Sequence, residues 1–214
     1  MREKKMKTKI IIERHGQSEG NADRIYLGHT DFGLTAEGER QAKITAEHLK
    51  DEKIDAIYSS DLKRAYQTAL PHASLRGMEI VSVPDLREMF VGDWEEKQIP
   101  DLIRDYGDEF SVRRFYVDFR YPGGESIREA MVRMNDAVTE IARANLGKTV
   151  LLVSHSAAIR ALWYYISGAT CPNMLDAVSV LPNAAYAVAE FDGERLIPVE
   201  YGIADHLPSK KFLA

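Results

Sequence analysis

Hydrophobic and polar positions alternate in blocks along the chain, with short apolar runs separated by longer amphipathic stretches. The apolar runs are rich in β-branched residues, which is typical of buried strands. This alternation predicts an α/β protein whose central sheet is mostly parallel. The strands that we expect are, in chain order, 9–13, 54–58, 80–83 and 149–153, followed by a terminal hairpin formed by 185–191 and 196–201.

Apolar positions at helical spacing predict helices between these strands. Thr35 can cap a helix that runs to about Leu49, and a second helix is expected over 62–73. Ser126 can cap a long helix, and a further helix is expected over 157–167. One apolar stripe of the long helix should face the core; it consists of Ile127, Met131, Met134, Val138 and Ile141.

Residues 97–121 depart from this alternation, because aromatic and arginine side chains are mixed there without a strand pattern. We interpret the segment as a small helical insertion that forms a cap over a site, although helices packed on the sheet would give a similar pattern. Pro122-Gly123-Gly124 ends the segment. No repeat or low-complexity segment divides the chain, so residues 1–214 are expected to form a single domain.

The 214 residues carry a formal net charge of −5, and the only clustered basic stretch is the short Arg2-Glu3-Lys4-Lys5. Nucleic acid is therefore not an expected partner, because backbone binding needs a clustered basic surface. Nothing approaches the roughly 18 consecutive apolar residues of a membrane span, and the charged start lacks a signal-peptide core. Cys171 is the only cysteine, which excludes an intramolecular disulfide and favours a reducing, cytoplasmic compartment.

Two histidines occupy equivalent places at the ends of predicted strands. His15 follows the first strand, and His155 follows the strand 149–153. In open α/β sheets ligands bind beyond the carboxyl ends of the strands, so the two histidines should meet there. The same strand ends add charged side chains, which are Arg14, Arg64 and Glu88.

This combination of side chains suits the transfer of a phosphoryl group. Guanidinium groups match phosphate oxygens in shape and stay charged. A neutral imidazole can attack phosphorus, and a second, protonated imidazole can stabilise the phosphoryl oxygens. A carboxylic acid can protonate the leaving alkoxide, which typically contributes a factor of about 10²–10⁴ in rate.

Short motifs follow one another in a fixed order from about residue 8 to residue 200. They are Arg14-His15-Gly16 with Ser18 and Asn21; Gly28, Asp31, Leu34-Thr35, Gly38 and Gln41-Ala42; Ser59-Ser60-Asp61-Leu62-Lys63-Arg64-Ala65 with Gln67-Thr68; Leu86-Arg87-Glu88, Gly92 and Trp94-Glu95; Gly124-Glu125-Ser126; and Ser154-His155 with Ile159-Arg160-Ala161-Leu162. In this order they resemble the histidine phosphatase superfamily, also called the phosphoglycerate mutase-like family. A lone Arg-His-Gly would carry little weight, whereas the ordered set covers most of the chain.

The resemblance implies a three-layer α/β/α sandwich and a phosphohistidine mechanism. His15 matches the nucleophile, and Arg14, Arg64 and His155 match the phosphate pocket around it. Glu88 matches the proton donor, which would protonate the leaving oxygen and then activate water or a second acceptor. Further contacts to phosphate or substrate are implied for Ser18, Asn21, Gly28, Ser156 and the pair Arg113-Arg114. No metal or organic cofactor is implied, the partner is a small phosphorylated metabolite, and a homo-oligomer is compatible with the sequence.

Two residues depart from the family pattern. Ser156 stands where many members have glycine, and its hydroxymethyl group can narrow the pocket or add a hydrogen bond. Glu13 precedes Arg14 at a position where small or apolar residues are commoner. Its carboxylate either pairs with Arg14 or faces away from the site, and we favour the second interpretation.

A metal enzyme with histidine ligands is one alternative class. It is disfavoured because His15 and His155 lack a third ligand at a recognisable spacing. The other histidines have no comparable setting: His48 and His72 are expected on helix surfaces, while the places of His29 and His206 stay open. A binding module without catalysis is a second alternative, and it is disfavoured because every matched charged position is filled.

Within the enzyme interpretation, the expected function is a phosphatase of small phosphomonoesters, with cofactor-dependent phosphoglycerate mutase as the alternative. Three residues, Gly20, Leu27 and Val91, stand where such mutases typically carry other residue types, and Trp94-Glu95 resembles the phosphatase branch. The pair Arg113-Arg114 favours the mutase, because it resembles the arginine pair with which mutases hold charged groups of a substrate.

Overall fold

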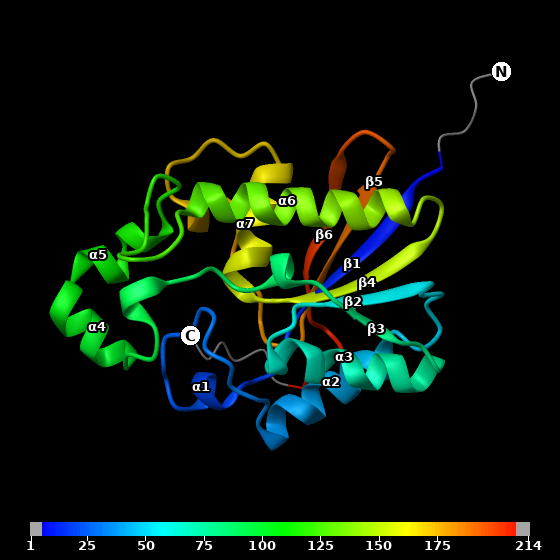
Figure 1. Ribbon diagram of the computed structural model, residues 1–214, viewed down its shortest axis with the longest axis horizontal. Helices are drawn as coiled ribbons and strands as arrows, with labels where there is room; N and C mark the ends of the chain where they lie inside the picture. Colours follow the sequence, from blue (N-terminus) through cyan, green and yellow to red (C-terminus); the bar gives the residue numbers. More distant parts are fainter. Residues whose placement is uncertain (1–5, 209–214) are drawn as a thin grey trace.

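The structure, a computed structural model, describes residues 6–208 (Figure 1). Within these residues a six-stranded sheet has the order β3-β2-β4-β1-β5-β6. The parallel part contains β1 (Thr8–Arg14), β2 (Ala56–Ser59), β3 (Ile80–Ser82) and β4 (Thr149–Ser154). The antiparallel hairpin consists of β5 (Tyr186–Phe191) and β6 (Leu196–Ile203), with β5 beside β1. The predicted α/β class, its mostly parallel sheet and its terminal hairpin are confirmed.

Helices cover both faces of the sheet, which makes three layers. In Figure 1, α6 (Ile127–Ala144) and α7 (Ser156–Ile166) lie on one side of the strands. On the other side lie α2 (Ala36–His48) and α3 (Lys63–Arg76). The five residues of the predicted apolar stripe of α6 are all buried.

Side chains of β1 alternate between the two cores, as the pleat of a strand requires. Ile10 and Ile12 belong to the core beneath α6 and α7, and Ile11 belongs to the core beneath α2 and α3. Both faces of β1 are covered, so its central residues are all apolar rather than alternately apolar and polar. Such a continuous apolar run predicts a strand that is buried on both faces.

Side-chain caps begin the helices where the sequence predicts them. Thr35 accepts a hydrogen bond from the backbone N–H of Gly38 at the start of α2. Ser126 and Glu129 form a capping box at the start of α6, in which each side chain accepts from the other residue's backbone N–H.

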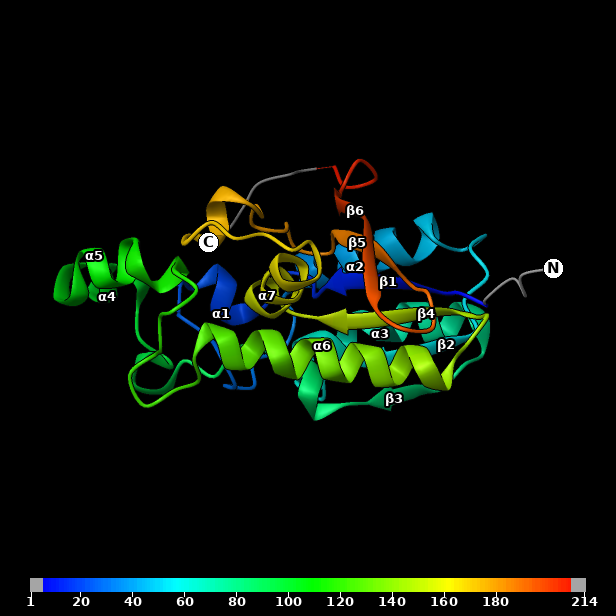
Figure 2. The same ribbon diagram turned by 90° about the horizontal axis from the view of Figure 1, so that it is seen from above.

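The long connection from β3 to α6 forms a cap at one end of the molecule. It contains α4 (Ile99–Tyr106), α5 (Asp108–Ser111) and three short 3₁₀ turns, Pro84–Leu86, Gly92–Trp94 and Arg113–Phe115. Both ribbon views place α4 and α5 beyond the carboxyl ends of β1 and β4 (Figures 1 and 2). Trp94 is fully buried among aromatic rings that join the cap to the domain, including Tyr26, Phe110, Phe119 and Tyr121.

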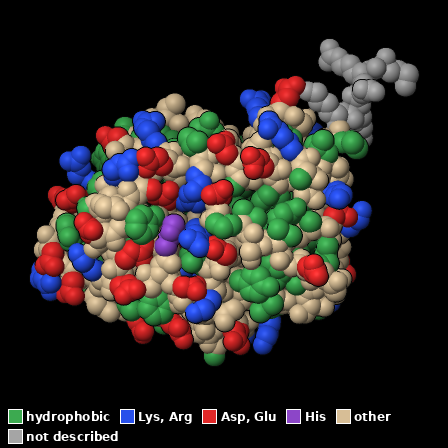
Figure 3. Space-filling model, viewed as in Figure 1, with side chains coloured by type: hydrophobic (Ala, Val, Ile, Leu, Met, Phe, Trp, Pro, Cys, Tyr) green, Lys and Arg blue, Asp and Glu red, His purple; other side chains and the backbone are tan. Residues whose placement is uncertain are grey.

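The remaining short elements are α1 (Glu19–Ala22), which follows β1, and a 3₁₀ turn at Met174–Asp176 after α7. Side chains of both charge signs are scattered over the face seen in Figure 3, and hydrophobic side chains gather there over the region of β3 and α3. No helix within residues 6–208 has the length and apolar character needed to cross a membrane.

Candidate active site

The two histidines that follow β1 and β4 meet at the carboxyl edge of the sheet. Arg14 and Ser154 are register partners in the β1–β4 pair, so the residues after them lie side by side. The rings of His15 and His155 have centroids 5.1 Å apart, and both residues are buried. The expected convergence of residues from opposite ends of the chain is therefore observed.

The imidazole of His15 is neutral and has one free lone pair. Its Nδ1 lies 2.6 Å from the carbonyl oxygen of Gly16, which can only accept, so Nδ1 carries the proton and Nε2 does not. Burial lowers the pKa of His15 well below its ordinary value, and the positive charges of Arg64 and Arg14 lower it further. An unprotonated Nε2 at neutral pH is what nucleophilic attack requires.

Glycine is needed directly after His15 because α2 approaches the chain there. A Cβ atom on Gly16 would lie 2.4 Å from the carbonyl oxygen of Gly38. The backbone N–H of Gly16 donates to Thr68 Oγ1 at 3.0 Å, which ties this turn to α3. The close approach of α2 and the bond to α3 together set the direction of the His15 ring.

Arg14 supplies positive charge next to His15. Its Nη1 donates to the carbonyl oxygen of Leu181 at 2.5 Å, while its buried Nε has no partner within the described residues. Burial lowers the pKa of Arg14 to about 10, the charge of Glu88 opposes this shift, and the guanidinium stays charged at neutral pH.

Arg64 is held by two backbone carbonyls from the segment after α1. Its Nη2 donates to the carbonyl oxygen of Gly28 and its Nη1 to that of Thr30, both at 2.7 Å. Gly28 therefore orients Arg64 and does not line the cavity itself. A Cβ on Gly28 would lie 2.5 Å from the carbonyl oxygen of Met89, which explains glycine at this position.

The second imidazole of the site, His155, is expected to be protonated. The hydrogen bonds of its ring show that this expectation is wrong. Arg64 Nε donates to His155 Nδ1 at 3.2 Å, so the ring proton lies on Nε2, 2.9 Å from Ser60 Oγ. Burial lowers the pKa of His155 well below its ordinary value, and the charge of Arg64 adds to this effect. His155 is thus a neutral ring that braces Arg64 and contacts His15, and the positive charge of the site rests on the arginines.

The Glu88 carboxylate sits at the first turn of α7. Its Oε1 accepts from the backbone N–H groups of Ala158 at 2.8 Å and Met89 at 2.9 Å, and its Oε2 accepts from Ala157 at 3.1 Å. These three donors fix the carboxylate at the cavity wall on which His15 also lies. A helix that begins directly after His155 therefore positions the acid as well.

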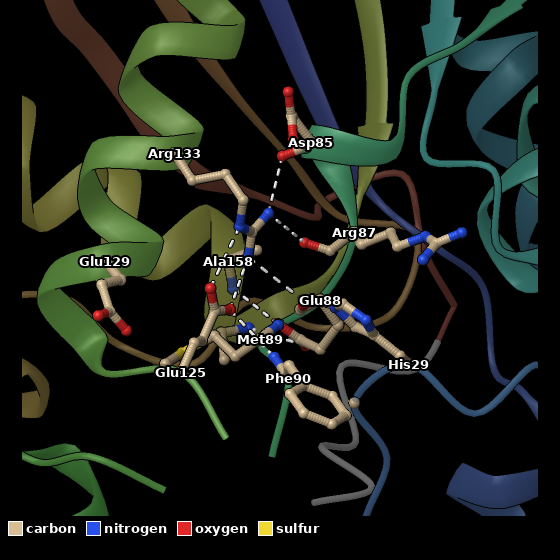
Figure 4. Close-up of polar contacts among 12 residues, drawn as sticks. His29, Asp85, Arg87, Glu88, Met89, Phe90, Glu125, Glu129, Arg133 and Ala158 are labelled. Carbon is tan, nitrogen blue, oxygen red and sulfur yellow. Dashed lines mark hydrogen bonds and ion pairs between the residues drawn. The ribbon is translucent and has the colours of Figure 1, made fainter. Parts of the chain in front are cut away.

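Arg133, which the sequence did not single out, supports the segment that leads to Glu88. It projects from α6 toward that segment (Figure 4). Its Nη1 donates to the carbonyl oxygens of Asp85 at 2.7 Å and Arg87 at 3.0 Å. Its Nη2 and Nε donate to Glu125 at 2.7 and 3.2 Å. One guanidinium thus connects α6, Glu125 just ahead of the helix cap, and the segment that leads to Glu88.

Two further side chains hold carbonyl oxygens of the same segment. Ser154 Oγ donates to the carbonyl of Leu86 at 2.8 Å. His29 Nε2 lies 2.9 Å from the carbonyl of Glu88, so this nitrogen carries the proton of His29. Each carbonyl from residue 85 to residue 88 is therefore bound by a side chain from another part of the fold.

A cavity of about 440 Å³ extends from this edge of the sheet to the cap. Four predicted catalytic residues line it, namely Arg14, His15, Arg64 and Glu88, whereas His155 lies behind them. The cap contributes Ile99, Ile103, Phe110, Arg114, Phe115 and Tyr121. Residues 97–121 are thus in position to contact what binds at His15.

The structure separates the substrate contacts that the resemblance implies. Asn21, Ser156 and Arg114 line the cavity. Ser18 does not, because its buried hydroxyl accepts from the backbone N–H of Asn21 and caps α1. Arg113 is exposed and lies against a separate surface pocket, so only the second arginine of the pair faces the site. Arg113 and Arg114 belong to a 3₁₀ turn, in which successive side chains point about 120° apart, and this explains why the two neighbours diverge.

His72 is not on a helix surface as expected, because it is fully buried where α3 packs on the sheet. Its Nε2 lies 2.8 Å from Glu13 Oε2, and both side chains are completely shielded from solvent. Burial raises the pKa of Glu13, and the contact with His72 opposes that shift. Glu13 therefore faces away from Arg14, as favoured, and has a buried partner. His48 is exposed, as expected.

Comparisons with known proteins agree with this arrangement. A family model for the histidine phosphatase superfamily (branch 1) matches residues 10–203. Phosphoserine phosphatase 1 of Hydrogenobacter thermophilus is 30% identical over 202 residues, 93% of this chain and 94% of that protein. A probable phosphoglycerate mutase, GpmB of Photorhabdus laumondii, is 38% identical over 157 residues, 72% of either chain. A mycobacterial glucosyl-3-phosphoglycerate phosphatase complexed with VO3 has a TM-score of 0.85 and 26% identity, covering 92% of this chain and 99% of that one.

Proposed function

The chain belongs to the histidine phosphatase superfamily, and we propose that it hydrolyses small phosphomonoesters through a phosphohistidine formed on His15. The observation that carries this proposal is the neutral His15 ring with an unprotonated Nε2, in a residue that lines the cavity together with Arg14 and Arg64. The names of the phosphatase relatives support the same reaction class.

In the first step, the Nε2 lone pair of His15 attacks phosphorus and the bond from phosphorus to the ester oxygen breaks. Glu88 donates a proton to the departing oxygen, which leaves as an alcohol. Arg14 and Arg64 are charged and bind the phosphoryl oxygens, whose charge grows in the transition state. The product of this step is a phosphoryl group bound to Nε2 and an unprotonated Glu88.

In the second step, the Glu88 carboxylate accepts a proton from water while the water oxygen attacks phosphorus. The bond between phosphorus and Nε2 breaks, which restores the neutral imidazole and releases inorganic phosphate. Glu88 is protonated again, so one turnover consumes one ester and one water molecule. The three amide donors to Glu88 keep it in place through both steps.

Phosphoglycerate mutase is the second candidate, supported by the names of several relatives. Transfer to a second hydroxyl requires that the phosphorylated enzyme hold its substrate rather than admit water. Only Arg114 of the pair Arg113-Arg114 lines the cavity, and Arg113 is exposed. The arginine pair that mutases use is therefore incomplete at the cavity, which favours hydrolysis over the mutase reaction.

A substrate panel tests the proposal. We expect the purified protein to release phosphate from p-nitrophenyl phosphate and from some sugar, glycerate or amino-acid phosphates, and we expect His15→Ala to abolish release. Absence of phosphate release from every member, together with efficient interconversion of 2- and 3-phosphoglycerate, would overturn it in favour of the mutase.

We also infer that the enzyme works in a reducing compartment such as the cytoplasm. The single cysteine, Cys171, is a free thiol in the structure and supports this inference. A free Cys171 thiol in protein purified from its host under native conditions is the expected result, and a mixed disulfide there would contradict it.

A further inference from the structure

Glu95 is an acidic side chain near the active site to which the proposed mechanism assigns no task. It follows the 3₁₀ turn Gly92–Trp94 in the connection that leads to the cap, and the buried ring of Trp94 anchors that turn. Glu95 itself is half-buried and does not line the cavity that contains His15. Any influence on the reaction therefore acts through the groups that its carboxylate binds.

The carboxylate of Glu95 gathers three consecutive backbone N–H groups of the segment after α1. Its Oε1 accepts from the N–H of His29 at 2.6 Å, and its Oε2 accepts from the N–H groups of Gly28 and Thr30, both at 3.2 Å. The hydroxyl of Thr30 also donates to Oε2, at 2.5 Å. Because backbone N–H groups removed from water need acceptors, these four donors on one carboxylate fix the conformation of the segment.

The same segment holds Arg64 at the site. The carbonyl oxygens of Gly28 and Thr30 accept from the two Nη atoms of its guanidinium. Asp31, the next residue, accepts from the backbone N–H of Lys63 at 2.7 Å. Lys63 begins α3, whose own N-cap residue makes no side-chain hydrogen bond, so Asp31 satisfies a donor of the first turn. Both the guanidinium and the first turn of the helix that carries it are thus attached to this segment.

Charge also links Glu95 to Arg64. Burial lowers the pKa of Arg64, and the negative charges of Glu95 and of two other carboxylates oppose this shift. The guanidinium therefore stays charged, as the binding of phosphoryl oxygens requires. A neutral residue at position 95 would remove one of these charges and weaken the attachment of the loop amides at the same time.

We propose that Glu95 is a positioning residue for Arg64, because it shapes residues 28–30 so that their carbonyl oxygens hold the guanidinium where the phosphoryl group binds. This inference rests on the proposed function, which places a phosphoryl group at His15. If Glu95 only stabilised the fold, its removal would weaken anion binding by the same factor whether or not Arg64 is present. The two roles therefore differ in a double variant.

Binding of orthovanadate, a phosphate analogue, is measured by titration calorimetry and needs no turnover. In Glu95→Gln the amide keeps one acceptor oxygen, but its NH₂ group faces backbone donors, so the loop loses part of its attachment. We expect the Kd for orthovanadate to rise about tenfold, as the loss of charge-assisted hydrogen bonds implies. Glu95→Asp keeps the charge on a shorter side chain and should show a smaller rise.

The double variant asks whether this effect passes through Arg64. Arg64→Met alone should raise the Kd for orthovanadate by at least about tenfold, because it removes a charged donor of the pocket. Addition of Glu95→Gln to Arg64→Met should then raise it by less than about threefold more, since the side chain that Glu95 positions is already absent. A further full tenfold rise, on the order of that in the single variant, would show that Glu95 acts independently of Arg64 and would overturn the proposal.

Glu96→Gln is the matched control, because Glu96 is the adjacent residue, carries the same charge and is exposed. Its Kd should stay within about twofold of the wild-type value, as expected for a surface charge. If Glu95→Gln does not fold, Thr30→Val takes its place; it removes one donor to Glu95 and should raise the Kd about threefold.

An unchanged Kd in the variant used, or an equal rise in Glu96→Gln, would overturn the positioning role. Release of phosphate from p-nitrophenyl phosphate by the wild type is measured alongside. A wild type that binds orthovanadate but releases no phosphate would overturn the proposed function instead, so the two failures are distinguishable.

Discussion

Arg133 holds Glu125 in a two-point ion pair while binding the chain that leads to Glu88. The contacts between Arg133 and Glu125 measure 2.7 and 3.2 Å, and Glu125 in turn accepts from the backbone N–H of Phe90 at 3.0 Å (Figure 4). Because Arg133 also binds the carbonyls of Asp85 and Arg87, the segments before and after Glu88 are attached to one rigid pair. We infer that Arg133 and Glu125 are positioning residues for the proton donor.

This inference predicts that loss of Arg133 affects substrates according to their leaving group. In Arg133→Met, kcat for alkyl phosphates should fall on the order of 10²-fold, because departure of an alkoxide needs the proton of Glu88. Hydrolysis of p-nitrophenyl phosphate should fall less than about tenfold, because p-nitrophenolate leaves without a proton. The measurement is kcat across a series of leaving groups.

Arg128→Met serves as the control, since Arg128 is exposed on the same helix. Arg133→Lys should lie between Arg133→Met and the wild type, because lysine keeps the charge but not the fork of donors. An equal loss on alkyl and aryl substrates would contradict a positioning role and leave only a structural one.

The environment of His15 predicts activity on the acid side of neutrality. Burial, with Arg64 and Arg14 nearby, lowers the pKa of His15, so the nucleophile stays unprotonated below its ordinary pKa. At pH 5.5 an imidazole of pKa about 6.5 would lose about tenfold in active form. We expect kcat/KM for p-nitrophenyl phosphate, corrected for substrate ionisation, to stay within about threefold between pH 7 and pH 5.5.

Removal of the positive charge of Arg64 tests whether that charge lowers the pKa of His15. Arg64→Met should move the acid limb of the kcat/KM profile to higher pH, because the positive charge of Arg64 disfavours protonation of His15. An acid limb at pH 6.5 or above in the wild type would show that His15 has an ordinary pKa.

The buried contact between His72 and Glu13 predicts a stability effect that grows with pH. His72→Ala leaves Glu13 without its partner and should lower the free energy of unfolding by about 3 kcal/mol at neutral pH. Burial raises the pKa of Glu13 in the folded state, so its contribution is favourable below its unfolded pKa and is lost as pH rises through the folded value. The deficit of His72→Ala relative to the wild type should therefore be larger at pH 8 than at pH 5.

Denaturant unfolding at both pH values measures this effect. Glu13→Gln in the His72→Ala background should remove the dependence on pH, since glutamine does not ionise. The same deficit at pH 5 and pH 8, or no deficit at all, would mean that Glu13 and His72 are not coupled.

The close approach of two glycines predicts that Gly16 does not tolerate a side chain. In Gly16→Ala the new Cβ would meet the Gly38 carbonyl, which is backbone and cannot move alone. We expect a loss of kcat of at least about tenfold, because a displaced turn misplaces His15. Gly193→Ala is a control for backbone strain without a clash: its φ of +96° disfavours alanine, but a Cβ there meets nothing within 4 Å and the residue does not line the cavity, so kcat should stay near the wild-type value.

The strands and the convergence of His15 with His155 could be predicted because they depend on short-range patterns. An apolar run such as Ile10-Ile11-Ile12 identifies a strand buried on both faces, and parallel strands bring their carboxyl ends together. The protonation of His155 could not be predicted, because it depends on which atoms of Arg64 and Ser60 reach its two nitrogens.

The burial of His72 follows from a pattern that is present in the sequence. Arg64, Thr68 and His72 are four residues apart on α3 and all are buried, so the face that carries Arg64 to the site also carries His72 inward. Arg133 offered no such signal, because its partners include backbone carbonyls about 45 residues away in sequence, and such contacts leave no residue pattern.

Detection of a phosphoryl group on His15 tests the central claim most directly. Wild-type protein mixed with a labelled phosphomonoester and quenched in alkali within the first turnover should carry label that acid removes, and peptide mapping should place it on His15. His15→Gln should carry none. Rapid phosphate release by wild-type protein with no label on His15, or with label on another residue, would contradict the account.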